Sequence, residues 1–336
     1  MVIVSIFSLL FSFTFTLIFT PHILNLALKI APFKKGKVDI KEGKRISHLG
    51  GVGIFISFLI VVLLMSLHKD FFTSQAKGII LGTTIIFLVG ILDDFIELSP
   101  ATKFLGQIIA TFALVVFGAT TKMVIAGPVG NIFITFIWML VIINALNLLD
   151  IMDGLCSGIT VIAAGAFLVV SFISNNLVTS ILCSFIIGAG LGFLRYNFPP
   201  ARIYLGDNGS MVFGFLLAAT AIMIDYAPLK RQIALLTPIL VLGLPLFDTA
   251  FVILMRILHG RAVMKKSKDH FALRLLTAGW KEPKTLLLMY LFALFFGASA
   301  ILINRVSNLQ GGVILVIIVS ICGLALKKIG AIKIDG

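Results

Sequence analysis

Long apolar runs alternate along the whole chain with short segments that hold most of the polar and charged residues. A helix needs about 20 largely apolar residues to cross a bilayer. Some of the runs are short, so we expect ten or eleven spans, drawn from residues 2–28, 50–68, 76–92, 104–118, 131–149, 157–174, 178–195, 208–224, 233–256, 285–303 and 312–326. The runs are continuously apolar, which excludes a transmembrane β-barrel. The pattern predicts an all-α polytopic membrane protein.

Composition supports this prediction. Of the 336 residues 60% are hydrophobic and 12% are charged, whereas soluble domains carry about 25% charged residues. So few charges could not cover the surface of a soluble fold. Residues 2–28 lack a basic leading region and a small-residue cleavage site, so we expect a retained span and not a signal peptide. We expect residues 1–336 to form a single transmembrane domain.

The cysteines and the net charge exclude other classes. Cys156, Cys183 and Cys322 are few, odd in number and scattered, which predicts neither a disulfide framework nor a zinc site. A net charge of +13 on a soluble protein would suggest nucleic acid. Here the basic residues lie mostly between apolar runs, where positive-inside topology and anionic lipid explain them. We expect no nucleic-acid partner.

The distribution of Lys and Arg predicts the orientation. If segment 29–49 is cytoplasmic and the spans alternate, 21 of the 27 basic residues fall on the cytoplasmic side and six on the other. Because cytoplasmic loops carry the excess of Lys and Arg, we expect the N-terminus outside and the C-terminus in the cytoplasm.

Carboxylates beside hydrocarbon are costly and mark functional sites. Six acidic residues lie at the predicted cytoplasmic ends of spans: Asp93, Asp94, Glu97, Asp150, Asp153 and Asp207. Asp93 and Asp94 end one span, and Lys103 follows beyond Ser99-Pro100. Adjacent carboxylates repel each other unless a cation lies near them, and a lysine can bind phosphate. The pair alone is also compatible with a proton relay in a transporter.

A second group of polar residues recurs at every third position: Asn144, Asn147, Asp150 and Asp153. On a helix they would form one slowly drifting stripe. Their oxygens suit Mg²⁺, which takes few protein ligands together with substrate phosphates. The alternative is that asparagines simply hydrogen-bond between membrane helices.

A third group runs from Arg195 through two prolines to Ser210. Asp207, Asn208 and Ser210 lie at a predicted helix start, where caps occur and where free N–H groups favour anions. A fourth group is the basic loop 256–284, and Lys44, Arg45 and His48 add a second basic cluster on the same face. Contact with lipid would explain such loops, but together they could also surround a phosphorylated substrate.

The order, spacing and sidedness of these four groups, from Lys44 to Arg274, resemble the polyprenyl-phosphate N-acetylhexosamine-1-phosphate transferases (glycosyltransferase family 4), in particular those that act on undecaprenyl phosphate and GlcNAc. The family also contains the muramoyl-pentapeptide translocase. The resemblance implies a cytoplasmic active site in the inner membrane, with Mg²⁺ or Mn²⁺ as cofactor. It also implies transfer of a sugar 1-phosphate from a UDP-sugar to polyprenyl phosphate, which releases UMP.

The resemblance also implies a role for each matching residue. The catalytic positions are Asp93, Asp94, Asp150, Asp153, Asp207 and His270. The substrate-binding positions are Lys44, His48, Lys103, Asn144, Asn197, Tyr204, Arg261 and Arg274. The metal positions are Asn147 and Asp207. These residues fall in or near the active-site loops 29–49, 93–103, 150–156, 195–210 and 256–284.

Two positions depart from the family pattern. The basic-loop motif usually has a second histidine where this chain has Leu273, and the usual Asp-Gly-x-Asp-Gly has Ile151 in place of the first glycine. Either departure could signal a different sugar preference or reduced activity.

The alternative function is a cation-coupled secondary transporter, which would place its acids near the bilayer midplane. Only Asp248 lies well inside a span, so the sequence favours the enzyme. The sequence leaves open the exact sugar, the polyprenyl length, the glycan pathway and the oligomeric state, a homodimer included.

Overall fold

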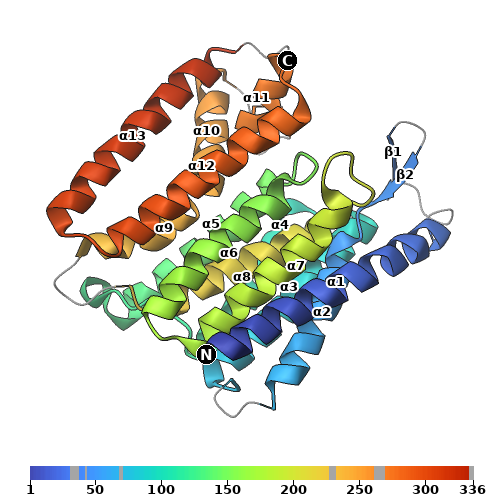
Figure 1. The fold of residues 1–336 in the computed structure, drawn as a ribbon, viewed down its shortest axis with the longest axis horizontal. Coiled ribbons are helices and arrows are strands. Elements are labelled where there is room, and N and C mark those ends of the chain that lie inside the picture. Colours follow the sequence, from blue (N-terminus) through green and yellow to red (C-terminus); the bar gives the residue numbers. More distant parts are fainter. Residues whose placement is uncertain (31–37, 42–43, 68–70, 227–231, 261–268, 333–336) are drawn as a thin grey trace. The chain divides into compact units, whose positions relative to one another are not determined.

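The computed structural model describes residues 1–30, 38–41, 44–67, 71–226, 232–260 and 269–332. The chain divides into two compact units, Met1–Ile224 and Asp225–Gly336 (Figure 1). Unit 1 contains α1 (Val2–Ile30), β1 (Val38–Lys41), β2 (Lys44–Ser47), α2 (Gly50–Met65), α3 (Ser74–Ile96), α4 (Pro100–Val116), η2 (Val124–Ala126), α5 (Gly127–Leu149), α6 (Leu155–Ile173), α7 (Leu177–Asn197) and α8 (Asp207–Met223).

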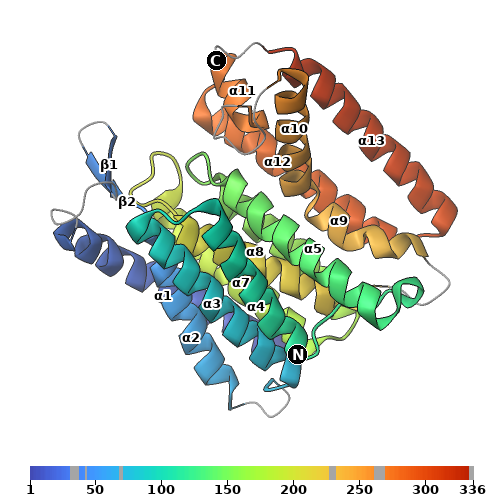
Figure 2. The same ribbon diagram turned by 180° about the vertical axis from the view of Figure 1, so that it is seen from behind.

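Helix α8 is the centre of unit 1. Every residue of α8 after Asp207 is buried, and α2, α3, α5, α6 and α7 all pack against this helix. Figure 2 shows α4 between α3 and α5, on the side of the bundle opposite α1. Gly90 of α3 allows the close approach to α8, because a Cβ atom there would lie 2.6 Å from the Cα atom of Asn208. The backbones of α3 and α8 therefore meet at the start of α8.

Unit 2 is a smaller group of helices: η3 (Gln232–Leu236), α9 (Thr237–Val241), α10 (Gly243–Leu258), α11 (Phe271–Thr277), α12 (Glu282–Ile303) and α13 (Asn308–Gly330). The predicted span 233–256 is broken here, since its two halves are bent by 72° around Leu242. Gly243 at this bend packs against the ring of Phe296 in α12. Around the start of α11, Phe271 packs against the rings of Phe247, Phe251 and Phe292.

The helices confirm an all-α polytopic membrane protein. Each of the eleven predicted apolar runs coincides with a helix or, for 233–256, with the bent pair. Within the described residues, seven helices are long and apolar enough to cross a membrane, or eight if the bent pair counts as one span, and α2, α4 and α8 are shorter apolar helices. Large apolar side chains face outward along α1 and α13, as a lipid environment requires. The number of spans stays a prediction.

One element was not predicted. Strands β1 and β2 form an antiparallel hairpin within the basic segment 29–49, with Val38 opposite Ser47 and Lys41 opposite Lys44. Ser47 also forms a parallel bridge with Ile203 of the loop before α8. The hairpin is too short to show a period-two pattern beside long apolar runs, so hydrophobic periodicity did not reveal it.

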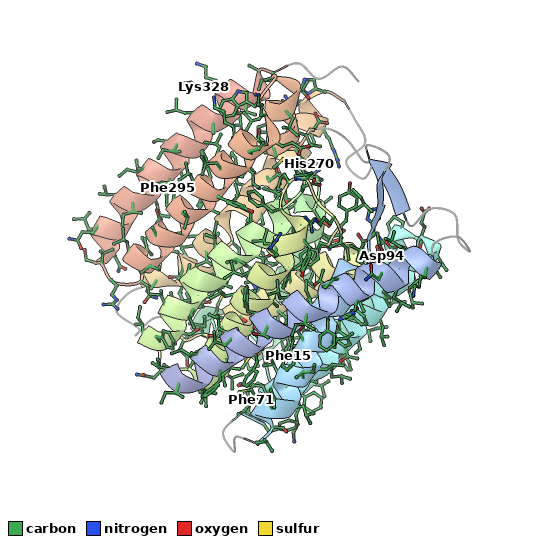
Figure 3. The ribbon with its side chains drawn as sticks, turned by 45° about the vertical axis from the view of Figure 1, so that its right-hand side comes forward. Phe15, Phe71, Asp94, His270, Phe295 and Lys328 are labelled. Carbon is green, nitrogen blue, oxygen red and sulfur yellow. The ribbon has the colours of Figure 1, made fainter. Side chains whose placement is uncertain are left out.

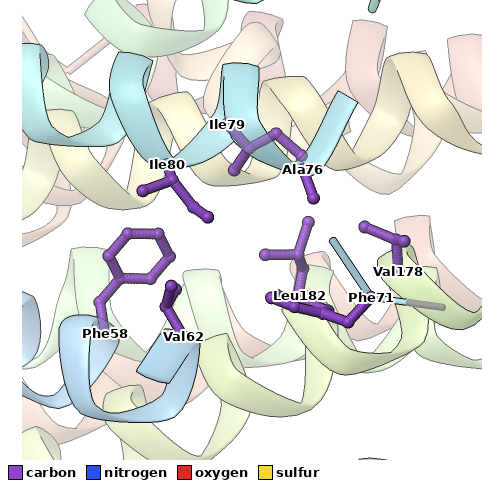
Figure 4. A pocket seen from close by; sticks show the side chains of 8 residues that line it. All are labelled: Phe58, Val62, Phe71, Ala76, Ile79, Ile80, Val178 and Leu182. Atoms are coloured by element: carbon purple, nitrogen blue, oxygen red, sulfur yellow. The ribbon is translucent and has the colours of Figure 1, made fainter. Parts of the chain in front are cut away.

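Unit 1 also contains a small apolar cavity at the end of α3 that is opposite Asp94 (Figures 3 and 4). Its volume is about 10 Å³, which is room for about one water molecule. The lining side chains are all apolar: Phe58, Val62, Phe71, Ala76, Ile79, Ile80, Val178 and Leu182. Such a cavity is a packing defect between α2, α3 and α7 and holds no substrate.

Candidate active site

The polar residues of unit 1 gather at one end of its bundle. Here α3 and α5 end, and α4 and α8 begin. Ser99 caps α4 by accepting a hydrogen bond from the Thr102 backbone N–H at 3.2 Å, and Pro100 occupies the first helical position. This sharp start places Lys103 in the first turn of α4, facing the end of α3. Segments far apart in the sequence thus supply one site.

Lys103 lies between two carboxylates. Its Nζ atom is 2.6 Å from Oδ2 of Asp93 and 2.5 Å from Oδ2 of Asp207. The amide nitrogen of Asn147, near the end of α5, donates to Oδ1 of Asp207 at 3.0 Å and to the Ser210 hydroxyl at 3.0 Å. Four helices therefore meet at Asp207. The ammonium group neutralises a pair of acids that would otherwise repel each other.

Asp94 makes different contacts from its neighbour Asp93. Its Oδ1 accepts from the backbone N–H of Asp207 at 3.3 Å, and its Oδ2 accepts from the backbone N–H and the side-chain amide of Asn208. Asp94 therefore caps α8 from another helix, where a carboxylate stabilises the N-terminal dipole. Asp207, Asn208 and Ser210 do lie at the start of α8, as the sequence indicated. None of the three caps its first turn, so capping does not account for any of them.

Asp150 directly follows α5 and is half-buried. Burial, with the negative charges of Asp207, Asp94 and Asp153, raises the pKa of Asp150 to about 8. A carboxyl group with this pKa holds a proton near neutral pH unless a cation comes close. The site thus has more acidic groups than Lys103 alone can neutralise.

The predicted helical stripe from Asn144 to Asp153 is broken, because α5 ends at Leu149 and Gly154 adopts a left-handed conformation with φ of 75°. The amide of Asn144 exchanges hydrogen bonds of 2.7 and 3.3 Å with Gln107 of α4. Asn144 therefore joins two membrane helices, which was the alternative for the asparagines. Asp153 lies beyond the break and accepts from the Ala201 backbone N–H at 2.9 Å.

Asn197 also holds the loop before α8. It is 3% exposed, and its Oδ1 accepts from the Gly154 backbone N–H and the Ser157 hydroxyl while its Nδ2 donates to the Ile203 carbonyl. Asp153 and Asn197 together fix the proline turn that leads to Asp207. Their direct roles toward substrate stay predictions.

His48 and Tyr204 form an aromatic pair at the same end of unit 1. Their ring centroids are 4.9 Å apart and the rings are tilted by 54°. The His48 carbonyl accepts from the side-chain amide of Asn208 at 2.9 Å, so this pair lies next to the carboxylates. For Lys44 the structure gives the backbone, as part of β2, and not the side chain. Arg261 falls outside the described residues.

The remaining predicted residues lie in unit 2. His270 Nδ1 is 2.7 Å from Oδ2 of Asp248, and both side chains are buried. Arg274 pairs with Asp269 at 2.8 Å and donates to the carbonyls of Gly330 and Ile332. Arg274 is 2% exposed, so in this structure it joins α11 to the end of α13. Its predicted role in binding substrate stays a prediction.

The donor set in unit 1 fits a hard divalent cation. The Lys103 ammonium marks the position between Asp93 and Asp207 where positive charge is stabilised. Oδ1 of Asn147 accepts no hydrogen bond from any described residue. Among the described residues, no three His, Cys, Asp or Glu side chains converge on one metal position. This is compatible with Mg²⁺, which keeps waters and takes phosphate oxygens as ligands.

Sequence reasoning missed some partners of the predicted residues. Gln107 is a single amide inside an apolar run, and in a membrane helix such a residue signals a polar contact. Asn208 was named as a residue of the helix start, but not as the partner of Asp94. Asp248 was identified as an acid inside a span, but nothing in its spacing indicated a pairing with His270, which lies 22 positions further along.

Comparison with known proteins places this helical membrane bundle in a class of membrane transferases. Residues 76–225 match the model of glycosyl transferase family 4. The chain is 31% identical, over 86% of its length and 82% of the relative's, to a probable undecaprenyl-phosphate N-acetylglucosaminyl 1-phosphate transferase of Bacillus subtilis. The chain therefore belongs to glycosyl transferase family 4.

Two further relatives show the range of the family. The chain is 30% identical to a phospho-N-acetylmuramoyl-pentapeptide-transferase of Halalkalibacterium halodurans, over 89% of this chain and 97% of the relative. It is also 30% identical to a decaprenyl-phosphate N-acetylglucosaminephosphotransferase of Mycolicibacterium smegmatis, over 75% of this chain and 71% of the relative. Identity alone does not separate the possible sugars.

Proposed function

We propose that the protein transfers N-acetylhexosamine 1-phosphate, with GlcNAc as the sugar, from a UDP-sugar to undecaprenyl phosphate. An oxygen of the polyprenyl phosphate attacks the β-phosphorus of the UDP-sugar, the bond from that phosphorus to the bridging oxygen breaks, and UMP leaves. The product starts a lipid-linked glycan of the cell envelope. The observation that supports this most strongly is the Asp93–Lys103–Asp207 cluster at the end of a membrane bundle, in a chain whose relatives act on polyprenyl phosphates.

Phosphoryl transfer requires mainly positioning and neutralisation of charge. In our proposal, Asp207 and Asn147 hold Mg²⁺ or Mn²⁺, which when bound supplies positive charge to the diphosphate. Lys103 moves from the carboxylates to a phosphate oxygen, and Asp93 orients the acceptor. Asp94 supports the site by capping α8. A phosphate monoester has a second pKa near 6, so the acceptor is largely ionised and needs orientation more than a base.

The aromatic pair His48–Tyr204 and the loop fixed by Asp153 and Asn197 form the nucleotide side of the proposed site. A ring such as that of Tyr204 can stack on uracil. The basic loop 256–284, with Arg261 and His270, binds the sugar and diphosphate. The basic residues of this loop suit a small sugar diphosphate better than a peptide-bearing donor, which favours GlcNAc over muramoyl-pentapeptide. Because Leu273 departs from the family motif, an epimer of GlcNAc is the alternative donor sugar.

The competing transporter hypothesis relied on Asp248. Both oxygens of its carboxylate accept hydrogen bonds, from His270 and from the Phe271 backbone N–H. A structural role therefore accounts for this acid without ion transport.

Purified protein should release UMP only when UDP-GlcNAc, undecaprenyl phosphate and Mg²⁺ are all present. Cation-driven uptake into vesicles without UMP release would contradict the proposal.

We also propose ten or eleven spans in the inner membrane, with the N-terminus outside and the active site and C-terminus facing the cytoplasm. Termini on opposite sides require the odd number of spans. The support is the concentration of 21 of the 27 basic residues on one side. A membrane-impermeant thiol reagent added to intact cells should fail to label Lys41→Cys and Ser267→Cys in a chain without its native cysteines. Ready labelling of both cysteines before lysis would show that the protein has the opposite orientation.

A further inference from the structure

Asp248 is a buried acid that has no role in the proposed reaction. It lies in α10, the second half of the bent helix pair, and is 2% exposed. Its Oδ2 is 2.7 Å from Nδ1 of His270, and its Oδ1 accepts from the Phe271 backbone N–H at 2.8 Å. One carboxylate thus holds both the imidazole ring and the backbone at the start of α11.

The surroundings make this arrangement rigid. Phe271 directly follows His270, and its ring packs against Phe247, Phe251 and Phe292. His270 itself is 3% exposed. Within the described part of the chain, Nε2 of His270 has no hydrogen-bond partner. The ring is therefore fixed through one nitrogen, and no described residue binds the other.

We propose that Asp248 is a positioning residue that keeps a proton on Nδ1 of His270 and so leaves Nε2 as the nitrogen that contacts the UDP-sugar. A carboxylate that accepts a hydrogen bond from one ring nitrogen fixes the tautomer and the orientation of the ring. The inference rests on the proposed function, because the contact of His270 with substrate comes from it. The tautomer itself does not depend on that function.

Asp248→Asn tests the inference with little change in shape. Asn retains an oxygen for the Phe271 N–H but presents its NH₂ group to Nδ1, so Nδ1 must become an acceptor and the proton moves to Nε2. Loss of such an outer partner typically costs 10–100-fold. We expect kcat/KM for the UDP-sugar to fall by about that factor. In ¹⁵N-histidine spectra the protonated nitrogen of His270 should change from Nδ1 to Nε2, with His270→Gln identifying its signals among the five histidines.

Two comparisons separate positioning from a general structural role. In a His270→Gln background, Asp248→Asn should lower kcat/KM no further. Asp269→Asn, which breaks the adjacent buried pair with Arg274, should lower thermal stability without changing the tautomer of His270. Wild-type kcat/KM in Asp248→Asn, or a loss that persists in full in the His270→Gln background, would overturn the inference.

The tautomer of His270 is measured without substrate. This measurement therefore tests the Asp248 pairing independently of the proposed function. A wild-type protein that has the proton on Nδ1 but transfers no sugar phosphate would contradict the proposed function and support the Asp248 pairing. A wild-type His270 that carries its proton on Nε2 alone would contradict the pairing, whatever the activity.

Discussion

Asp207→Asn is expected to lower kcat for UMP release by at least about 100-fold, the scale on which a single electrostatic contact is lost from an active site. Asn preserves the shape but removes the charge that faces Lys103 at 2.5 Å and Asn147 at 3.0 Å. Asn keeps only one side-chain oxygen, so one of these two groups would lose its acceptor at the start of α8. In the proposed site the cation also loses its main ligand. Activity should respond more weakly to added Mg²⁺.

Asp225→Asn is the matched control. Asp225 is exposed, directly beyond the end of α8 that is opposite Asp207. The same change of charge there should leave kcat and the Mg²⁺ dependence within about twofold of wild type. If Asp207→Asn turned over like the wild type, the cation would have to bind elsewhere.

Lys103→Met is expected to lower activity by a similar factor, about 100-fold, because it removes a positive charge from the site and not a negative one. Without the ammonium group, Asp93 and Asp207 face each other with no neutralising charge. The thermal midpoint in EDTA should therefore fall. Because Nζ no longer competes for the carboxylates, Mg²⁺ should raise the midpoint of the variant more than that of the wild type.

Lys77→Met provides the comparison for this prediction. Lys77 lies in the first turn of α3, at the end opposite Asp93, and its ammonium contacts the ring of Phe72. Its removal should change neither activity nor the response to Mg²⁺. An Lys103→Met variant with the activity and midpoint of the wild type would show that the ammonium does not neutralise the site.

The sequence predicted the helices well because lipid imposes a simple rule on them. An apolar run of sufficient length must form a helix in a bilayer. Ten of the eleven runs form one helix each, and 233–256 forms the bent pair. The gathering of Asp93 and Asp207 at one end was also predictable, since alternating spans bring every second loop to the same side. Helix breaks were less visible: the 72° bend near Gly243 lies inside a continuous apolar run.

Individual roles within the site could not be read from the sequence. Asp93 and Asp94 are adjacent, yet one pairs with Lys103 and the other caps α8. Successive residues on a helix point about 100° apart, so each meets a different neighbour. Which neighbour that is depends on the packing of α3 against α4 and α8. Likewise, the period of three from Asn144 continued in the sequence after α5 had ended at Leu149.

The most direct test of the account follows the β-phosphate of the donor. Purified protein would be given undecaprenyl phosphate, Mg²⁺ and UDP-GlcNAc labelled with ³²P at the β-phosphate and with ¹⁴C in the sugar. We expect both labels to enter one lipid product in equal amounts, with unlabelled UMP released and no product from Asp207→Asn. Sugar label in the lipid without the β-phosphate, or product from UDP-muramoyl-pentapeptide but from no UDP-N-acetylhexosamine, would contradict the account.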